Sequence, residues 1–493
     1  MPWFETPESR GAWGYHWKMN TMNPDIVQNG KRQIAAHYYP LTGPYASADK
    51  DILEYQLLLM KYAGADGVFI DWPGTRQRYD YPDNLANSNA LIAKIDSVGL
   101  KFAIVHEDRN WDVGMELDAR NDFIYMQNNY FNKQTYLNVN GGPLVLNFGP
   151  ITFHQPAQWD KILNGLNPKP KFLPLYGNTQ EIGANHVSGE YPWIYQDHPN
   201  VVNRYYTETN KFQIPLGVVY PGFHPFYAQG SADGPTWIIP LNGKQTFDYM
   251  LKQALQSNVN MIQIATWNDY GEGTMIEPTQ ELQYSLLTTM QEQLGVSYGE
   301  RELKLIFQLY QLRKQHKGNS GTQQKLDQAF NHLTSLNVND AETILNSLGP
   351  IDTGNNNNTN VDVKYTIKNR FLNTYLYDDN GQVKYGPLVT DDRFRWELET
   401  VNGQHTRIKN VQTKKYMNVE RGLNYVESST LPDTFWSAYW SILSIYGNDG
   451  VEYKRIQNKF KHTYLNLEKH LGYAECTDIQ ENAVSGHWSL IKV

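Results

Sequence analysis

The repeated alternation of short apolar runs with longer amphipathic stretches constrains the fold of residues 1 to about 315. This alternation is typical of strand–helix units around a parallel sheet. Eight runs predict strands, at Gln33–His37, Gly67–Asp71, Lys101–Val105, Pro143–Asn147, Lys171–Tyr176, Tyr191–Tyr195, Pro215–Tyr220 and Met261–Thr266. Between the first two, Asp51–Ala63 predicts a helix that begins at a Ser47 or Asp49 cap and ends at Gly64. Because eight parallel strands close a (β/α)₈ barrel, we expect an α/β TIM barrel here.

Polar or aromatic side chains come directly after nearly every predicted strand. In a (β/α)₈ barrel the loops after the C-terminal ends of the strands build the active site, so one pocket is expected to collect these groups. The residues expected to bind substrate there are His37, Tyr38, Asp71, Trp72, Glu107, Asn147, Tyr195, Tyr220, Trp267 and Asn268. Two alternatives stay open. His37 binds either a hydroxyl group or a core carbonyl, and Arg109 either orients a neighbouring acid or, as we favour, forms a buried ion pair with Asp108.

Composition narrows the partners of the chain. Its 43 Lys and Arg against 51 Asp and Glu give a net charge of −8, which argues against nucleic acid, because phosphate binding needs a basic surface. No run of about 18 apolar residues occurs, so no membrane-spanning helix is expected. Aromatic residues make up 13% of the chain, which favours a carbohydrate partner, since sugars offer faces for ring stacking and hydroxyl groups for polar ring tips.

No cofactor and no metal site are predicted. A single cysteine, Cys476, precludes an intramolecular disulfide and a cysteine-based zinc site, and the 13 histidines show no His-x-x-x-His spacing. Residues 1–10 have neither the basic nor the apolar segment of an export signal, which fits a cytoplasmic protein or one whose signal has been removed. We expect the second, with an extracellular, periplasmic or cell-surface location; the oligomeric state is left open.

The segment after the last predicted strand carries three acids, Asp269, Glu272 and Glu277. Glycoside hydrolysis commonly uses two carboxyl groups that flank the glycosidic bond, one to protonate the leaving oxygen and one as base or nucleophile. Asp269 and Glu272 are therefore predicted to be catalytic, with Gly271 and Gly273 expected to let the backbone approach substrate closely. The alternative is that acids near a strand end cap the next helix. Glu277, beside a proline, is the weaker candidate.

The same segment resembles two glycoside hydrolase families. Trp267-Asn-Asp-Tyr-Gly-Glu272 resembles the strand-eight signature of the fungal-type α-1,3-glucanases, family 71. The following Gly-Thr-Met-Ile-Glu-Pro278 is more similar to the endo-α-mannosidases and endo-α-mannanases of family 99, whose signature reads Trp-Asn-Glu-Trp-x-Glu-Gly-Thr. His37-Tyr-Tyr-Pro40 and Gly67-Val-Phe-Ile-Asp-Trp-Pro-Gly74 resemble segments at the first and second strands of these barrels. The resemblance covers about residues 33 to 290.

This resemblance implies that Asp269 and Glu272 are the catalytic pair, with Glu272 as the general acid/base. In family 99 the first acid is understood to deprotonate the sugar 2-hydroxyl, which gives a 1,2-anhydro intermediate and overall retention. Asp269 stands where family 99 has Glu, so its reach is shorter by roughly one C–C bond. Pro73 likewise stands where family 99 has Tyr.

Residues 362–493 contain a threefold internal repeat. In each copy an isoleucine precedes a tyrosine by eight positions and the copy closes on a tryptophan, at Ile367, Tyr375 and Trp396, at Ile408, Tyr416 and Trp440, and at Ile456, Tyr464 and Trp488. The three β-rich units resemble a β-trefoil of the ricin-like or fascin-like kind, a candidate carbohydrate-binding module without the usual Gln-x-Trp. The recurring tyrosines and tryptophans are expected to lie in its core.

A polar run at Gly354–Asn360 predicts a linker between the two parts, and residues 323–336 and 340–348 predict a helical hairpin ahead of it. We therefore expect a catalytic barrel at 1–315, a helical spacer and Asn-rich linker at 316–361, and an all-β trefoil at 362–493.

Together these patterns predict an enzyme, a glycoside hydrolase that cleaves internal α-glycosidic linkages of a polysaccharide or glycan by a retaining two-carboxylate mechanism. One alternative is a hydrolase of another linkage, such as that of an algal galactan, because barrel motifs specify the machinery better than the sugar. A second is a non-catalytic two-domain lectin, which the intact Asp269 and Glu272 disfavour.

Overall fold

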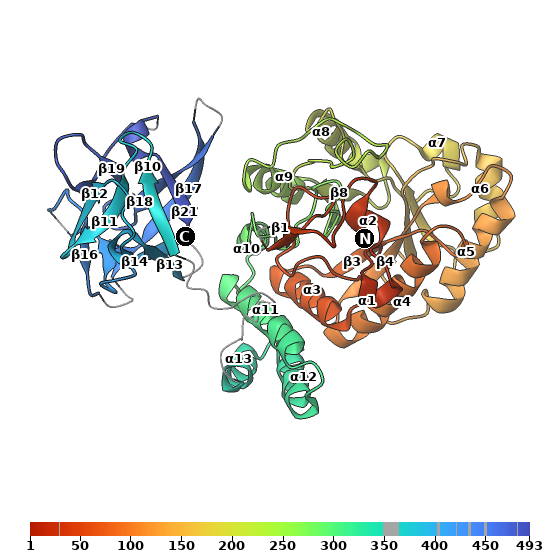
Figure 1. Cartoon of the computed structure of the whole chain (residues 1–493). Coiled ribbons are helices and arrows are strands. Elements are labelled where there is room, and N and C mark those ends of the chain that lie inside the picture. Colours follow the sequence, from red (N-terminus) through yellow and green to blue (C-terminus); the bar gives the residue numbers. More distant parts are fainter. Residues whose placement is uncertain are drawn as a thin grey trace. The chain divides into compact units, whose positions relative to one another are not determined.

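The computed structural model describes residues 1–28, 30–348, 364–401, 405–420, 422–431, 435–447, 451–480 and 482–493. The chain divides into two compact units, Met1–Gly354 and Asn355–Val493 (Figure 1). The first unit mixes helices and parallel strands, whereas the second is built of antiparallel strands. The linker predicted at Gly354–Asn360 lies outside the described residues. No helix among the described residues has both the length and the apolar character needed to span a bilayer.

The strands of the first unit form two parallel sheets. One runs in the order β3 (Gly67–Trp72), β4 (Lys101–His106), β6 (Gly142–Asn147) and β7 (Lys171–Pro174), and the other pairs β8 (Leu216–Val219) with β9 (Met261–Ile264). Two short antiparallel additions are β5 (Asn138–Val139) beside β6 and the hairpin of β1 (Val27–Gln28) with β2 (Lys31–Arg32). These strands confirm six of the eight predicted ones.

Helices surround these strands in Figure 1. They are α1 (Pro7–Arg10), α2 (Tyr15–Lys18), α3 (Lys50–Ala63), α4 (Tyr81–Val98), α5 (Glu116–Asn129), α6 (Pro156–Leu163), α7 (Thr179–Ile182), α8 (Asn200–Glu208), α9 (Gln245–Gln256), α10 (Ser285–Leu294) and α11 (Glu300–Gln315), with 3₁₀ turns η1 (Asp108–Asn110) and η2 (Thr209–Lys211). The predicted ends of α3 are confirmed. The Asp49 carboxylate accepts the N–H groups of Asp51 (2.9 Å) and Ile52 (3.3 Å), and Gly64 ends the helix with φ +93°.

Two predicted strands are wrong. In Gln33–His37 the backbone bonds to the N-terminal segment instead of a sheet, because the Ala35 N–H donates to the Trp17 carbonyl (2.8 Å) and the Gln33 N–H to the Ile26 carbonyl (3.0 Å). Tyr191–Tyr195 forms only one bridge to the chain after β7, at Tyr191. The next residue, Pro192, has no N–H to continue a ladder, and its carbonyl is taken by the Gln263 side chain (2.9 Å).

The predicted helical hairpin exists as α12 (Ser320–Thr334) and α13 (Val338–Ser347), but it is no free spacer. Its buried leucines belong to the same hydrophobic core as the strands of the first unit. Lys61 and Tyr62 of α3 donate to the carbonyls of Thr334 (2.7 Å) and Leu333 (3.0 Å) at the end of α12. The hairpin is therefore part of the first compact unit.

The second unit is one antiparallel sheet of twelve strands within its described residues. The strands are β10 (Lys364–Asn369), β11 (Tyr375–Asp379), β12 (Gln382–Gly386), β13 (Trp396–Val401), β14 (His405–Asn410), β15 (Tyr416–Asn418), β16 (Glu427–Ser429), β17 (Trp440–Tyr446), β18 (Glu452–Asn458), β19 (Tyr464–Leu467), β20 (Ala474–Thr477) and β21 (Trp488–Lys492), with 3₁₀ turns η3 (Asp392–Phe394), η4 (Trp436–Ala438) and η5 (Val484–Gly486).

The sequence repeat is visible in the register of this sheet. Each repeated tryptophan pairs across strands with a buried asparagine, as Trp396 with Asn410, Trp440 with Asn458 and Trp488 with Asn369. The three tryptophans and the three isoleucines are fully buried, as predicted. The three tyrosines are only half-buried, so their predicted place in the core is wrong. The next residue of each strand points inward instead, because side chains alternate along a strand.

Candidate active site

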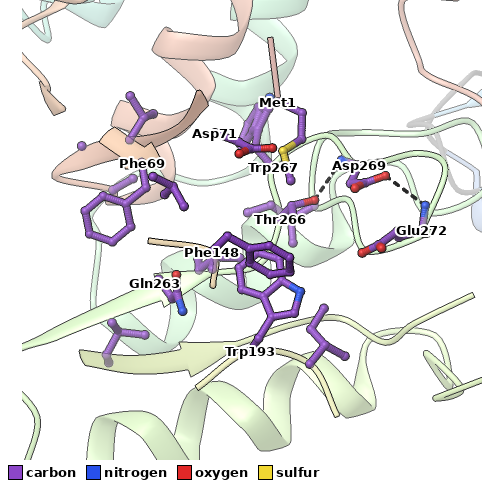
Figure 2. Close-up of a pocket in the computed structure, with 18 of the residues that line it drawn as sticks. Met1, Phe69, Asp71, Phe148, Trp193, Gln263, Thr266, Trp267, Asp269 and Glu272 are labelled. Atoms are coloured by element: carbon purple, nitrogen blue, oxygen red, sulfur yellow. Dashed lines mark hydrogen bonds between the residues drawn. The ribbon is translucent and has the colours of Figure 1, made fainter. Parts of the chain in front are cut away.

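A cavity of about 1170 Å³ opens where the parallel strands of the first unit end. Acidic side chains reach it from three of these ends: Asp71 from β3, Glu107 from the residue after β4, and Asp269 and Glu272 from the loop after β9. Figure 2 shows Asp71, Asp269 and Glu272 around one side of the cavity, with the Trp267 ring among them. The structure thus brings together the two predicted catalytic acids and three of the predicted binding residues, Asp71, Glu107 and Trp267.

A tight loop holds the two predicted catalytic acids in place. The Asp269 N–H donates to Thr266 Oγ1 (2.8 Å), and the Glu272 N–H donates to Asp269 Oδ1 (3.0 Å) (Figure 2). Asp269 is therefore oriented by the backbone of its partner. The third acid of this segment, Glu277, is buried and accepts hydrogen bonds from three side chains, Gln56 (2.8 Å), Tyr45 (2.6 Å) and Tyr270 (2.8 Å). Its role is structural.

Gly273 serves the packing of this loop. Its φ of +65° is in the left-handed region, and a Cβ at this position would lie 2.6 Å from the carbonyl oxygen of His224. The close approach also ties the loop to its neighbour, since the His224 N–H donates to the Glu272 carbonyl (2.8 Å).

Glu107 is held by arginine. Arg109 Nε lies 2.9 Å from Glu107 Oε2 and Arg109 Nη2 donates to Oε1 at 3.0 Å, a two-point contact that fixes the carboxylate. The favoured pairing of Arg109 with Asp108 is wrong. Asp108 lies in the 3₁₀ turn η1 and points to the other side, where it accepts backbone N–H groups that include those of Ile151 (2.9 Å) and Thr152 (2.7 Å).

Burial changes the proton affinity of all four acids. Burial, and next the charge of Asp269, raise the pKa of Glu272 to about 8. Burial, and next the charge of Asp71, raise the pKa of Glu107 to about 8 against the opposing effect of Arg109. The pKa values of Asp71 and Asp269 are also raised, chiefly by burial. At neutral pH Glu272 therefore keeps a proton that it can donate.

Aromatic rings form much of the remaining wall. Phe148 and Trp193 meet edge to face with ring centroids 5.1 Å apart, and Phe223 stacks on Trp237 at 4.2 Å. Figure 2 places Phe148 and Trp193 across the cavity from Asp71. Flat rings beside a few converging polar groups are typical of a site that binds a sugar.

Three predicted binding residues lie in the core instead. Trp72 is fully buried against Tyr125 (ring centroids 5.9 Å apart), because it follows Asp71 in β3 and successive side chains face opposite sides of a strand. Asn147 is fully buried and bonds His106 (2.9 Å) and Asp108 (3.1 Å). Tyr220 is fully buried within the hydrophobic core. None of the three lines the cavity.

Four more predicted binding residues are also absent from its wall. Asn268 is buried and donates to Tyr45 Oη (3.0 Å). Tyr195 lines a separate, smaller pocket. His37 stacks on His224 with centroids 3.7 Å apart, and its Nε2 lies 3.3 Å from the Pro225 carbonyl, which favours the carbonyl alternative over a sugar hydroxyl. Tyr38 packs edge-on against His224.

Sequence reasoning did not assign Tyr227, Trp193 or Phe148 to the site. Tyr227 donates from Oη to Glu272 Oε1 at 2.8 Å, although it lies in a long loop without periodicity. Phe148 directly follows a predicted strand, and this position was the one available signal. Within the described part of the chain, no group of three or more His, Cys, Asp or Glu side chains is arranged to hold a metal ion.

Tyr227→Phe is expected to lower kcat about tenfold and to move the alkaline limb of the pH–rate profile upward. The Tyr227 hydroxyl stabilises ionised Glu272, so its loss raises the pKa of Glu272 further and misplaces the carboxyl group. The profile of kcat/KM against pH measures both effects. Tyr249→Phe, at an exposed ring on α9, is the matched control, and equal profiles for both variants would refute the contact's role.

No protein-family model matches the chain, and no curated protein matches it. Among solved structures, an endo-α-mannosidase of family 99 from Bacteroides thetaiotaomicron is similar with 19% identity, over 62% of this chain and 96% of the other, at a TM-score of 0.49. A glycoside hydrolase-like protein shares 14% identity over 58% and 90%, at 0.43. A GlcNAcα1-4Gal releasing endo-β-galactosidase from Clostridium perfringens shares 30% identity over 27% of this chain, at 0.25, and the match spans only 32% of that structure.

Proposed function

We propose that the chain is a glycoside hydrolase that cleaves internal α-linkages of a polysaccharide or glycan, with Asp269 and Glu272 as its catalytic pair. The observation that carries this proposal is the position of Glu272, a half-buried carboxyl group in the cavity wall, with a pKa raised to about 8, beside a second acid on the same loop. A glycosidase needs an acid that keeps its proton near neutral pH and a partner that accepts one.

The two acids divide the proton transfers between them. Glu272 donates its proton to the glycosidic oxygen as the C1–O bond breaks, while Asp269 takes the proton of the sugar 2-hydroxyl and O2 closes onto C1. Water then opens this 1,2-anhydro ring: Glu272 takes the proton of the attacking water, and Asp269 returns its proton to O2. Two inversions at C1 give overall retention. Because Asp269 is short, we infer that the sugar ring lies close to the loop after β9.

The other polar groups position the sugar. Asp71 and Glu107 accept hydrogen bonds from sugar hydroxyl groups. Arg109 holds Glu107 in place through its two-point contact. Phe148 and Trp193 offer ring faces for the neighbouring sugar units. The buried Asp71 Oδ1 has no hydrogen-bond partner among the described residues, which supports a role in contacting substrate.

We further infer that the first unit is a (β/α)₈ barrel and that the second is a β-trefoil that binds the same polysaccharide. The threefold register of the second unit supports the trefoil. A tethered binding module raises the local concentration of substrate without altering the chemistry. This combination suits an enzyme outside the cell or at its surface, where polysaccharides are met.

Product analysis by proton NMR on α-glucan, α-mannan and algal polysaccharides tests the proposal. We expect an oligosaccharide whose first-formed anomer is α, from one of the α-linked substrates. If only a β-linked galactan were cleaved, the proposed α-linkage would be wrong. If a polysaccharide were bound but none were cleaved, the protein would be a lectin and not an enzyme.

The pH profile of the reaction is a separate prediction. Activity is expected to fall as pH rises above about 8, because Glu272 then loses the proton that it must donate. Activity also falls toward acid pH as Asp269 becomes protonated, and burial raises the pKa at which this happens. Initial rates of kcat/KM from pH 4 to 10 measure both limbs. An alkaline limb near the ordinary glutamate pKa of about 4.3 would exclude Glu272 as the acid.

A further inference from the structure

The six parallel strands of the first unit are not equally buried. All residues of β6 and β8 are buried, and so are those of β4 after its first residue. By contrast, β3 is only half-buried at Gly67, Val68 and Phe69, and β9 at three of its four residues. Strands of a parallel sheet are normally covered on both faces. Incomplete cover is therefore concentrated on the two strands β3 and β9.

These two strands also have one free edge each. β3 pairs with β4 and β9 pairs with β8, and among the described residues no strand pairs with the second edge of either. A free edge presents a row of N–H and C=O groups that need hydrogen-bond partners. The segment expected to be the first strand, Gln33–His37, does not supply them, because its backbone bonds to the N-terminal loops.

The active-site cavity extends between these two edges, along the seam from the acids to the opposite ends of the strands. Its wall there includes Gly67–Phe69 and Met261–Ile264, and Figure 2 shows Phe69 and Gln263 facing the same space. Apolar side chains of α3, α9 and α10 also line the seam, namely Met60, Ala63, Leu251, Ala254, Met290 and Leu294. The space thus has the apolar lining and the two flanking strand edges that surround a strand in the core of a sheet.

Met1 lies at the end of this seam where the acidic side chains are. Met1 lines the cavity, and Figure 2 shows it beside Asp71 at the end of β3 and beside Trp267. Polypeptide leading into Met1 along the seam would run from the N-terminal to the C-terminal ends of β3 and β9. It would therefore lie parallel to both.

We propose that the seam seats one further β-strand, an apolar segment of about six residues in the same polypeptide that leads directly into Met1. Its length matches β3, which has six residues or about 20 Å at 3.3 Å per residue. Its N–H and C=O groups pair with β3 on one side and β9 on the other. With this strand and the extended segment 191–195, the strand positions number eight and the barrel closes.

This strand also affects the site, and here the inference rests on the proposed function. Met1 and Trp3 line the cavity, and Trp3 stacks on His16, which lines it too, with ring centroids 4.2 Å apart. A strand anchored between β3 and β9 fixes the path of these residues. The wall next to Asp71 is then rigid enough to orient a sugar.

Adding residues ahead of Met1 tests the inference. The 493-residue chain is compared with the same chain carrying Thr-Val-Val-Ile-Val-Ala before Met1, and with a third carrying six Gly and Ser residues there. We expect the apolar extension to raise the melting temperature by several degrees and the Gly/Ser extension to leave it unchanged. Amide hydrogen exchange within β3 and β9 is expected to slow by at least about tenfold only with the apolar extension.

Equal exchange in β3 and β9 for all three chains would overturn the inference. If the chain with the apolar extension aggregates, a synthetic peptide of the same sequence is added to the 493-residue chain instead. The inference then requires that the peptide slow amide exchange in β3 and β9. These readouts do not involve turnover. Failure of the strand is therefore distinguished from failure of the proposed hydrolase.

Discussion

Glu272→Gln is expected to lower kcat on a natural polysaccharide by about 10²–10⁴-fold, the usual contribution of a general acid. Glutamine keeps the shape of the side chain and can still accept the hydrogen bond of Tyr227, but it has no proton to give to the leaving oxygen. An aryl glycoside with a good leaving group needs little protonation, so its cleavage is expected to suffer much less. Initial rates on both substrates measure the difference.

Glu292→Gln is the matched control, because Glu292 is exposed on α10 and lies 3.8 Å from Lys244, away from the cavity. Its rates are expected to equal those of the unchanged protein. Glu107→Gln separates the two glutamates with a raised pKa, and we expect it to weaken binding more than it slows the chemical step. If Glu107→Gln alone abolished turnover, the acid role would belong to Glu107.

The sequence predicted elements best where local chemistry decides them. The cap of α3 depends on Asp49 and Gly64, and both act within one helical turn, so no tertiary information is needed. The place of Asp269 and Glu272 at the cavity was predictable for a similar reason, since the two residues are three positions apart in one loop after the same strand. Six strands were likewise found from their apolar runs.

The sequence could not decide which face of a strand points into the cavity. Gly67–Trp72 is nearly all apolar, and such a run gives no alternation from which to tell that Asp71 faces the cavity while Trp72 packs outward against Tyr125. The prediction that Asn147 binds substrate failed for another reason. Its partners His106 and Asp108 come from another strand end, so only the folded chain shows that its amide is already bonded.

Long-range contacts explain the remaining differences. Tyr227 is 45 residues from Glu272, and its loop has no periodicity that would direct the hydroxyl group to the site. The segment 33–37 has the composition of a strand, yet its backbone N–H groups donate hydrogen bonds to the carbonyls of Trp17 and Ile26. The apolar pattern thus marked a segment in which Ile34 and Ala35 are buried, but it did not predict the hydrogen-bond partners that keep the segment out of the sheet.

Asp269→Asn is the second substitution with a large expected effect, a loss of about 10²–10⁴-fold in kcat, because the amide cannot take a proton from the substrate. Asparagine can still accept the Glu272 N–H through Oδ1, so the loop should keep its shape. The charge of Asp269 helps to raise the pKa of Glu272. Removing that charge lowers the pKa, so the alkaline limb of the residual activity is expected to move to lower pH.

The pH dependence of the residual rate distinguishes this coupling from simple damage to the site. Asp340→Asn, at an exposed carboxylate on α13, serves as the control and is expected to change neither the rate nor the alkaline limb. A merely misfolded site would lose activity at every pH without moving the limb. A variant Asp269→Asn with full activity, or with its alkaline limb unmoved, would show that the two carboxyl groups do not work as a pair, because a coupled neighbour must change the proton affinity of the remaining acid.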